Sequence, residues 1–333
     1  MGTRIVALTA CALLALAAPA SGSEPAGSWA ATASMAAPRA HISATPLANG
    51  RVLVVGGAGL TSTGLYDAAS GTWLAGGTLN EPRGLHVAVR LADGRVLVAG
   101  GGTYRATAEL YDPATNSWTP TGTMNVSRID ATGTLLRDGR VLVVGGLAGD
   151  GSGVQASAEL YDPATGSWTP TGSLRTPRRS HSAALLPDGT VLVVGGSNSS
   201  TLTVHAAERY DPARGRWSRA GNSSTRGIAA VLLNTDHVLV VGGPAAELFD
   251  PARNRWAPTS SMTSVHGGPA VVLQDGRVLM AGGGDGDVYS PATGTWTATG
   301  PMVIPYASAG GVDSPCQKFG GCQPLADAAL YTP

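Results

Sequence analysis

Seven residues with chemically useful side chains occupy the same place in a repeated sequence pattern. Each stands four positions after a Met or Leu, or after Asn222 in the fifth copy; they are Arg39, Arg83, Arg128, Arg178, Arg226, His266 and Tyr306. Guanidinium groups bind carboxylate and sulfate groups through several directed N–H donors. If the series converges in space, it predicts an electropositive site for an acidic ligand. Tyr104 is expected on the same face and extends that site.

A second series, of acids, offers a structural use for the same cations. The residue two positions before each repeated aromatic is acidic in five copies: Glu109, Glu159, Glu208, Glu247 and Asp287. Acids and cations on one face can pair with each other, and such networks are as ordinary as binding sites. We favour this ion-pair alternative for the series. The first copy has Gly64 in place of the acid, so Arg39 is the arginine that we expect to be available to a ligand.

The remaining polar residues do not suggest a metal site. His41 stands eight residues before its turn, whereas His86 and His181 stand seven before theirs, so the three side chains need not share a strand face. We expect packed, hydrogen-bonded histidines and no metal or other cofactor. Gly282–Asp287 is not followed by a helix, so it is no dinucleotide fingerprint, and it lacks the further ligands of a calcium loop.

The elements that must position these residues recur along nearly the whole chain. Seven tryptophans, from Trp29 to Trp296, are spaced by 39 to 50 residues, a period typical of propeller or solenoid repeats. In one copy, Asp138–Trp168, an Asp-Gly turn, an apolar strand, a Gly pair, a variable loop, a second strand and a Tyr-Asp-Pro turn precede the tryptophan. The Asp-Gly pairs predict hairpins in which both turn residues have positive φ, with Asp236-His237 as a weakened copy. Continuously apolar runs such as Val141–Val144 predict strands covered on both faces.

Neighbouring copies must stack to bury such strands, and closing the stack into a ring protects the free edges. The Gly pair, the Tyr-Asp and the Trp resemble the kelch repeat family of β-propellers, over roughly residues 24–333. The resemblance implies an all-β, seven-bladed propeller of four-stranded blades. In that fold the series from Arg39 to Tyr306 would circle one mouth of the central channel.

The two ends of the chain predict how the ring closes. Trp29 belongs to an outer-strand pattern with nothing in front of it, and Ala328–Pro333 is a third-strand pattern with no Trp after it. We therefore expect an N-terminal outer strand to complete the last blade, which gives seven blades. Six blades is the alternative, if Val303–Gly321 does not form two strands.

The N-terminus predicts export. Residues 1–20 combine Arg4, an apolar run at Ile5–Ala18 and a small-residue cleavage site, as in a secretory signal. The run is too short for a retained membrane span. We expect a single domain at residues 21–333 that is secreted, extracellular or periplasmic. An oxidising compartment predicts a disulfide between Cys316 and Cys322.

The charge of the chain reduces the number of possible kinds of partner. The formal net charge is +0 and Lys318 is the only lysine, so neither nucleic acid nor an acidic membrane has electrostatic support as a partner. We expect a monomeric, non-catalytic binding protein whose ligand, a protein or an acidic or carbohydrate molecule, contacts the Arg-lined face. The loops there are longest at Leu147–Ala158 and Ser197–Ala207.

The kelch resemblance leaves an enzyme as the alternative, since the fold hosts sugar isomerases and copper-radical oxidases. The oxidase chemistry needs a Cys cross-linked to a Tyr, and the predicted disulfide leaves no spare thiol. We therefore favour binding over catalysis.

Overall fold

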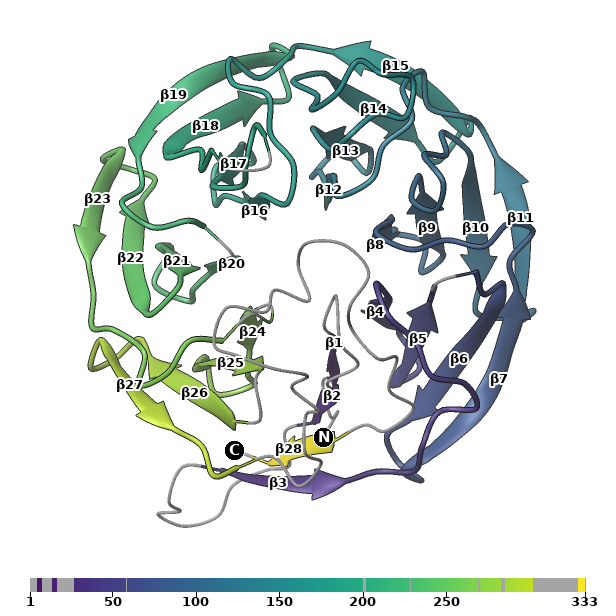
Figure 1. Ribbon diagram of the computed structural model, residues 1–333, viewed down its shortest axis with the longest axis horizontal. Helices are drawn as coiled ribbons and strands as arrows, with labels where there is room; N and C mark the ends of the chain where they lie inside the picture. The colour runs from purple at the N-terminus through teal and green to yellow at the C-terminus, as the bar shows by residue number, and fades with distance from the viewer. Residues whose placement is uncertain are drawn as a thin grey trace.

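The computed structural model describes residues 27–57, 59–199, 202–227, 229–266, 268, 270–282 and 285–301, together with the backbone of three strands at 5–7, 14–16 and 329–332. The chain forms four-stranded sheets arranged around a central axis (Figure 1), which confirms the all-β propeller class. Among these residues no helix is long and apolar enough to cross a bilayer.

Six of the sheets are blades in which four consecutive strands follow one another from the centre to the rim. Blades 1 to 3 comprise β4 (Ser43–Pro46), β5 (Arg51–Val55), β6 (Ser62–Asp67) and β7 (Thr72–Thr78); β8 (Val87–Arg90), β9 (Val96–Ala99), β10 (Ala108–Asp112) and β11 (Ser117–Thr121); and β12 (Thr132–Leu135), β13 (Val141–Val144), β14 (Ala158–Asp162) and β15 (Ser167–Thr171). Blades 4 to 6 comprise β16 (Ser182–Leu185), β17 (Val191–Val194), β18 (Ala206–Asp211) and β19 (Arg216–Asn222); β20 (Ala229–Leu232), β21 (Val238–Gly242), β22 (Ala245–Asp250) and β23 (Arg255–Pro258); and β24 (Ala270–Val272), β25 (Val278–Gly282), β26 (Asp285–Ser290) and β27 (Thr295–Ala298).

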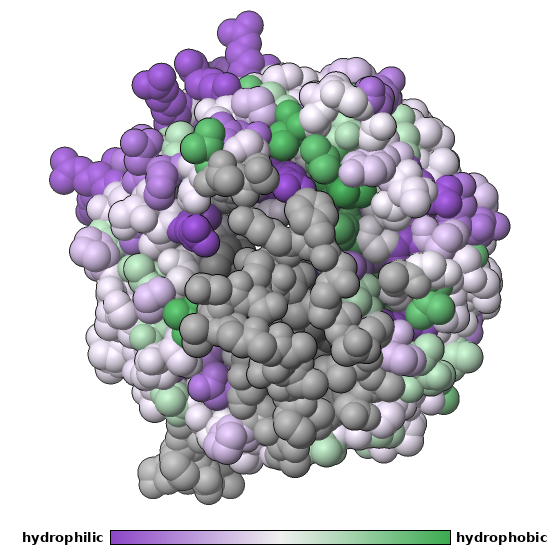
Figure 2. All heavy atoms as spheres, in the orientation of Figure 1, coloured by the Kyte–Doolittle hydropathy of each residue, from purple (hydrophilic) through white to green (hydrophobic). Residues whose placement is uncertain are grey.

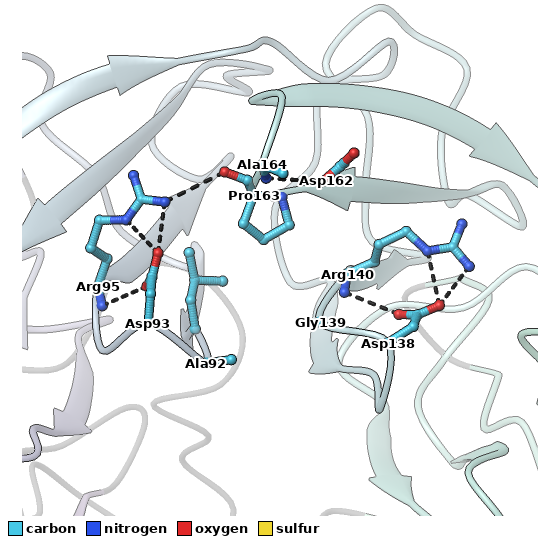
Figure 3. Close-up of a pocket in the computed structure, with 10 residues that line it drawn as sticks. Ala92, Asp93, Arg95, Asp138, Gly139, Arg140, Asp162, Pro163 and Ala164 are labelled. Carbon is cyan, nitrogen blue, oxygen red and sulfur yellow. Dashed lines mark hydrogen bonds and ion pairs between the residues drawn. The ribbon is translucent and has the colours of Figure 1, made fainter.

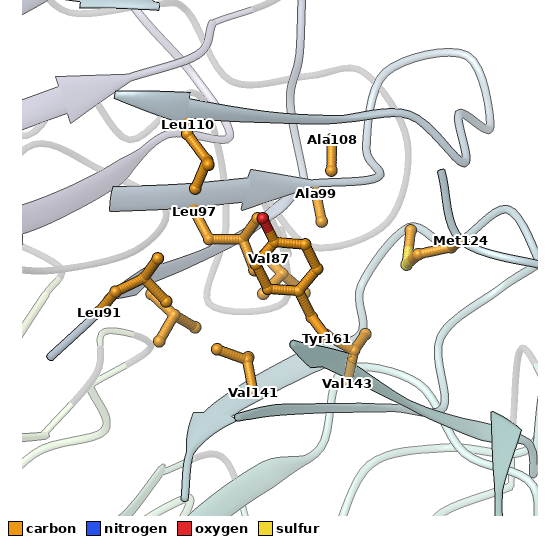
Figure 4. Close-up of a cluster of buried hydrophobic side chains, with 11 residues drawn as sticks. Val87, Leu91, Leu97, Ala99, Ala108, Leu110, Met124, Val141, Val143 and Tyr161 are labelled. Atoms are coloured by element: carbon orange, nitrogen blue, oxygen red, sulfur yellow. The ribbon is translucent and has the colours of Figure 1, made fainter. Parts of the chain in front are cut away.

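The hydrophobic core lies between blades. Val87, Leu97 and Leu110 of blade 2 pack with Val143 and Tyr161 of blade 3 in one buried cluster (Figure 4). The second strands β5, β9, β13 and β17 are covered on both faces, and their apolar side chains are at most 1% exposed. The continuously apolar runs therefore behave as predicted, because each blade buries the sheet face of its neighbour.

The tryptophans link neighbouring blades at the rim. Nε1 of Trp168 in blade 3 donates to the carbonyl oxygen of Gly122 at 2.8 Å, just after the outer strand of blade 2. A Cβ at Gly122 would lie 2.1 Å from the carbonyl oxygen of Gly166, so only glycine lets the next blade's turn approach this closely. The repeated Trp and Gly thus act together to hold adjacent blades in contact.

The Asp-Gly hairpins differ from the turn that the sequence predicted. Gly139 has a φ of 86°, but Asp138 is not in the positive-φ region. Its carboxylate instead accepts the backbone N–H of Arg140 at 3.0 Å, the local side-chain bond for which Asp is favoured in turns. The prediction of two positive-φ residues was wrong. In blade 5, Asp236 takes the place of the glycine with a φ of 62°.

The number of repeat blades is six, not the expected seven. A further four-stranded sheet, β1-β2-β28-β3, stands between blades 6 and 1 (Figure 1). Its outer pair is the predicted one, since the N-terminal β3 (Ser28–Ala31) runs antiparallel to β28 (Ala329–Thr332).

The other two strands of this sheet, β1 (Ile5–Ala7) and β2 (Leu14–Leu16), come from the predicted signal sequence, and β2 runs parallel to β28. The sheet therefore lacks the strand order of a repeat blade. The predicted inner strands within Val303–Gly321, and with them Cys316 and Cys322, lie outside the described residues.

Candidate functional site

One end of the ring, which we call the loop face, carries the connections between second and third strands and the links from each outer strand to the next inner strand. Because neighbouring strands are antiparallel, these two kinds of connection emerge at the same end. Tyr104, Leu202 and Val265 lie in them and are 45%, 60% and 62% exposed. In the view of Figure 2, strongly hydrophilic residues project from the upper left of the rim, and a group of hydrophobic residues lies inside the upper rim.

Three of the predicted rim arginines are buried partners in ion pairs. Nη2 of Arg83, Arg128 and Arg178 lies 3.1, 3.1 and 2.9 Å from Oε1 of a glutamate in the same blade, and the three arginine side chains have no exposed surface. The partners are Glu109, Glu159 and Glu208. Nη1 of each arginine also donates to the carbonyl of the first glycine of the Gly pair. The ion-pair alternative therefore describes these three arginines, which tie the strands of their own blade together.

The backbone holds each acid as well. In blade 3, Oε2 of Glu159 accepts the N–H of Asn125 at 2.7 Å and Oε1 accepts the N–H of Val126 at 3.2 Å. Blade 4 repeats this around Glu208, at 2.8 and 3.2 Å. We call this donor set the carboxylate socket: the two backbone N–H groups that follow the Met or Leu, plus the cation that comes two residues later. Converging N–H groups and a cation favour an ionised carboxylate.

His266 replaces the arginine in the socket of blade 6. The side chain of His266 is fully buried; its Nε2 lies 2.9 Å from Oδ2 of Asp287, and its Nδ1 lies 2.9 Å from the Gly282 carbonyl oxygen. The backbone N–H groups of Thr263 and Ser264 donate to the same carboxylate at 3.0 and 3.3 Å. The predicted series therefore includes His266 as a structural equivalent of the arginines.

Blade 5 corrects one sequence assignment. Glu247 accepts the backbone N–H of Ser224 at 2.9 Å and the hydroxyl groups of Ser223 and Ser224 at 2.6 and 2.7 Å. Ser223, not Asn222, therefore fills the Met or Leu position, and Arg226 follows it after three residues instead of four. Arg226 is consequently exposed, and its side chain makes no hydrogen bond or ion pair to the part of the chain that the structure describes.

Arg39 of blade 1 is the exception among the buried arginines. Its Nη1 donates to the carbonyls of Gly56 and Ser62 at 2.6 and 2.7 Å, and its Nη2 donates to the Ser62 hydroxyl at 2.9 Å. Arg39 is only 6% exposed, yet no acid among the described residues pairs with it. Burial lowers the pKa of Arg39 without opposition, whereas Glu109 opposes that effect at Arg83. The absence of a partner acid, expected from Gly64, leaves a buried positive charge uncompensated.

A second group of residues, the mouth ring, was not recognised from the sequence. Two positions after each rim arginine of blades 1 to 4 the backbone is left-handed, with φ of 57° at His41, 55° at Leu85, 56° at Asp130 and 50° at Ser180. Each of the last three donates its N–H across a blade boundary to the carbonyl of the one before, at 3.2, 3.1 and 3.0 Å. Such geometry costs a residue other than glycine about 1–3 kcal/mol and persists only where its surroundings enforce it.

Asp130 is the most polar point of the mouth ring. Its Oδ2 accepts the hydroxyl of Ser180 at 3.3 Å. Burial raises the pKa of the Asp130 carboxyl, and the nearby charges of Arg179 and His41 act in the opposite direction. The fixed place of these four residues, two positions after each rim arginine, was the signal in the sequence that could have revealed this group.

Two of the three histidines predicted to be packed and hydrogen-bonded, His86 and His181, are so. Nε2 of His86 lies 2.7 Å from the Ser43 hydroxyl, and Nε2 of His181 lies 2.8 Å from the Thr132 hydroxyl. Burial lowers the pKa of both imidazoles to about 3. His41 does not share their environment, since it belongs to the mouth ring. No group of three His, Cys, Asp or Glu residues that could hold a metal occurs within the described residues.

Two tyrosines, Tyr104 and Tyr306, were predicted to belong to the site on the loop face. Tyr104 is exposed and packs against Gly149 of blade 3, where an added Cβ would lie 2.0 Å from the Tyr104 Cβ. Its φ is 56°, so this loop too is held in a left-handed conformation. Tyr306 lies outside the described residues.

The opposite end of the ring carries the short hairpins and has a groove of about 320 Å³ between blades 2 and 3 (Figure 3). Its charged groups satisfy one another. Arg95 lies 2.7 Å from Asp93, and Arg140 lies 2.7 Å from Asp138. Because the same Arg–Asp pairing recurs at Arg277 and Asp275 of blade 6, the groove belongs to the repeat. It gives no reason to move the candidate site away from the loop face.

Comparison with known proteins agrees with this architecture. The kelch motif matches residues 132–175 and 178–224. The solved structure titled "Structure of YjhT" is similar to 80% of this chain and 99% of its own, with a TM-score of 0.64 and 15% identity. A fungal alcohol oxidase of the AA5 family, in complex with copper, is similar to 78% of this chain and 73% of its own, with a TM-score of 0.52 and 20% identity. A search of curated proteins gave no match.

These identities are low enough that the two likenesses concern the fold alone. The chain therefore contains two matched kelch motifs, and its fold is similar to that of these two solved structures.

Proposed function

We propose that this protein is a secreted, non-catalytic binding module that takes its ligand on the loop face, at the mouth ring. The observation that carries the proposal is the run of four residues other than glycine held in left-handed backbone at His41, Leu85, Asp130 and Ser180. Strain that the surrounding structure maintains is concentrated at ligand sites in proteins. Strand ends on a rigid scaffold also present loops that differ from blade to blade.

The chemistry of the mouth ring suits a polar ligand with both donors and acceptors. Asp130 offers carboxylate oxygens, Ser180 a hydroxyl group and Arg179 a guanidinium group. Tyr104 and Leu202 add exposed apolar surface on the same face. An acidic peptide or a carbohydrate combines these features, whereas a purely apolar ligand would offer no hydrogen-bond donor to the Asp130 carboxyl.

A binding screen tests the proposal. The mature chain, residues 21–333, is screened against glycan and acidic-peptide arrays, and any ligand found is titrated against Asp130→Asn and Arg214→Ala. Asp130→Asn keeps the shape of the side chain and is expected to weaken binding at least tenfold. Arg214 lies on the opposite face, 76% exposed, and its substitution is the matched control. If both variants bind the ligand as tightly as the parent does, the ligand does not bind at the mouth ring.

Export is part of the proposal and has its own test. The predicted signal at residues 1–20 and the predicted disulfide between Cys316 and Cys322 support it. Removal of the signal would also remove β1 and β2, so the sheet β1-β2-β28-β3 belongs to the unprocessed chain only. Intact mass before and after reduction, on protein recovered from the secreting host, should show a shortened N-terminus and one bridge. A full-length chain with two free thiols would contradict both expectations.

A sugar isomerase is the second candidate, favoured by the Asp130 carboxyl. A carboxyl whose pKa burial has raised can donate and accept protons nearer neutral pH than an exposed one. The same titration separates the two functions, because a catalytic Asp130 predicts turnover of the bound sugar that Asp130→Asn abolishes. Copper-radical chemistry has less support, since Nε2 of both His86 and His181 faces a hydroxyl group inside the fold.

A further inference from the structure

Five blades hold an acid on the backbone N–H groups of the carboxylate socket, blade 5 without the cation, and in blade 1 the acid that should fill the socket is absent. Blades 2, 3 and 4 fill it with glutamates paired to arginines, blade 5 with Glu247 and blade 6 with Asp287. In blade 1 the equivalent position is Gly64, and the two equivalent backbone N–H groups belong to Ala36 and Ala37. Neither N–H has an acceptor among the residues that the structure describes.

Arg39 occupies the socket in the same way as its counterparts. Its bond to Gly56 spans 17 residues, as do those of Arg83 to Gly100 and of Arg128 to Gly145. In blades 2, 3 and 4 an Nη2 hydrogen of the arginine is used on the glutamate, and in blade 2 Nε is used on it as well. In Arg39 those two N–H groups have no acceptor within the described part of the chain. A nine-tenths buried cation therefore directs unused donors toward the place of the absent carboxylate.

We propose that the blade 1 socket binds a carboxylate supplied by a ligand. The ligand group replaces the side chain that Gly64 lacks, accepting from Nε and Nη2 of Arg39 and from the backbone N–H groups of Ala36 and Ala37. This rests on the proposed function to the extent that the socket opens on the loop face. Two sources share the chemistry: an acidic side chain or C-terminus of a protein, and the carboxylate of a sugar acid.

The chain itself provides a test, because the absent acid can be restored. Gly64 is outside the left-handed region, so its backbone accepts a side chain, and an added Cβ would lie 3.3 Å from the Trp73 ring, close enough to require a small shift. Gly64→Glu should raise Tm by a few degrees, because it neutralises Arg39 from within. Gly64→Gln is the neutral isostere and should not raise Tm, which separates charge from packing.

The ligand arm uses the mature chain with defined probes at constant ionic strength. Sodium acetate tests the shared chemistry, and N-acetylglutamate and glucuronate represent the two sources. Acetate should raise Tm of the parent saturably, with chloride as the control, and one of the larger acids should bind at least tenfold more tightly. Gly64→Glu and Arg39→Gln should each abolish the response.

Failure here can be told from failure of the proposed function. The socket proposal is overturned if none of the three acids changes the Tm of the parent and Gly64→Glu is no more stable than Gly64→Gln. That result would not contradict a ligand at the mouth ring. A response that survives Gly64→Glu would equally overturn it, since the carboxylate would then bind elsewhere. Loss of screened ligands in Asp130→Asn, with the acetate response intact, would support both sites separately.

Discussion

Nη2 of Arg128 lies 3.1 Å from Oε1 of Glu159, with one side chain unexposed and the other 2% exposed. Arg39 makes the same backbone contacts as Arg128 but has no such partner. The two arginines are therefore a matched pair that differs chiefly by one buried carboxylate.

Substituting each arginine in turn measures how much that carboxylate contributes to the free energy of unfolding. Arg128→Ala leaves Glu159 buried without its cation, which typically costs about 3–5 kcal/mol. Arg39→Ala loses similar backbone contacts but also removes an uncompensated charge, so we expect its free energy of unfolding to fall by about 2 kcal/mol less. Urea unfolding of both variants checks this difference. Equal losses would show that the ion pair adds nothing and that the buried charge of Arg39 is compensated elsewhere.

The sequence predicted the blades well because each blade contains the same local motifs. The Gly pair, the Asp-Gly turn and the Trp fix strand ends locally, and Val141–Val144 could be assigned to a doubly covered strand from its composition alone. The acid two residues before each repeated aromatic likewise predicted the ion pairs with the arginines. Local patterns of this kind can be recognised within one blade, without knowing how the neighbouring blade packs.

What the sequence could not predict depended on contacts between blades. The left-handed backbone of Leu85 and Asp130 is set by hydrogen bonds from one blade to the next, and nothing in their residue types demands it. In blade 5 the missing Met or Leu removed the anchor, so Asn222 was aligned one residue away from Ser223, which holds Glu247. The seventh blade was inferred from the strand at each end, and its other two strands could not be assigned from pattern.

The Trp residues give a second matched pair. Trp168 donates its indole N–H to Gly122 at 2.8 Å, whereas the indole N–H of Trp118 is buried without a partner. Phenylalanine keeps most of the apolar surface of either ring and removes the donor. Trp168→Phe should cost about 1 kcal/mol more than Trp118→Phe, since a net hydrogen bond contributes roughly that much and an unpaired buried donor is unfavourable. Thermal unfolding of the two variants compares them directly, and a larger loss for Trp118→Phe would contradict the bond.

The buried histidines predict a loss of stability in mild acid. His86 and His181 have pKa values of about 3 in the folded chain, against 6.5 as the ordinary value. Below pH 6.5 the unfolded chain takes up protons that the folded chain refuses. The free energy of unfolding is therefore greatest above pH 6.5 and falls as the pH drops toward 3, by up to about 1.4 kcal/mol per pH unit for each histidine.

Substitution identifies the source of that slope. His86→Gln removes one titrating group, so its free energy of unfolding, measured between pH 4 and pH 6, should change less steeply than that of the parent. His237→Gln is the control, because His237 lies beside an exposed turn. If all three proteins show the same slope, His86 is not the group that takes up the proton on unfolding.

The closing strand provides the last prediction. β3 pairs with β28 through Trp29 and Tyr331, and Nε1 of Trp29 donates to the Thr299 hydroxyl of blade 6 at 3.0 Å. Deleting Glu24–Ser34 removes this strand and leaves one side of β28 without a partner, and an open strand edge is a template for aggregation. The truncated mature chain should melt at lower temperature and form oligomers on size exclusion. Trp29→Phe separates the two effects, because it removes the bond to Thr299 while keeping the strand, so it should lower Tm slightly and remain monomeric. A truncation that melts like the parent, and elutes with it, would show that the ring does not depend on its N-terminal strand.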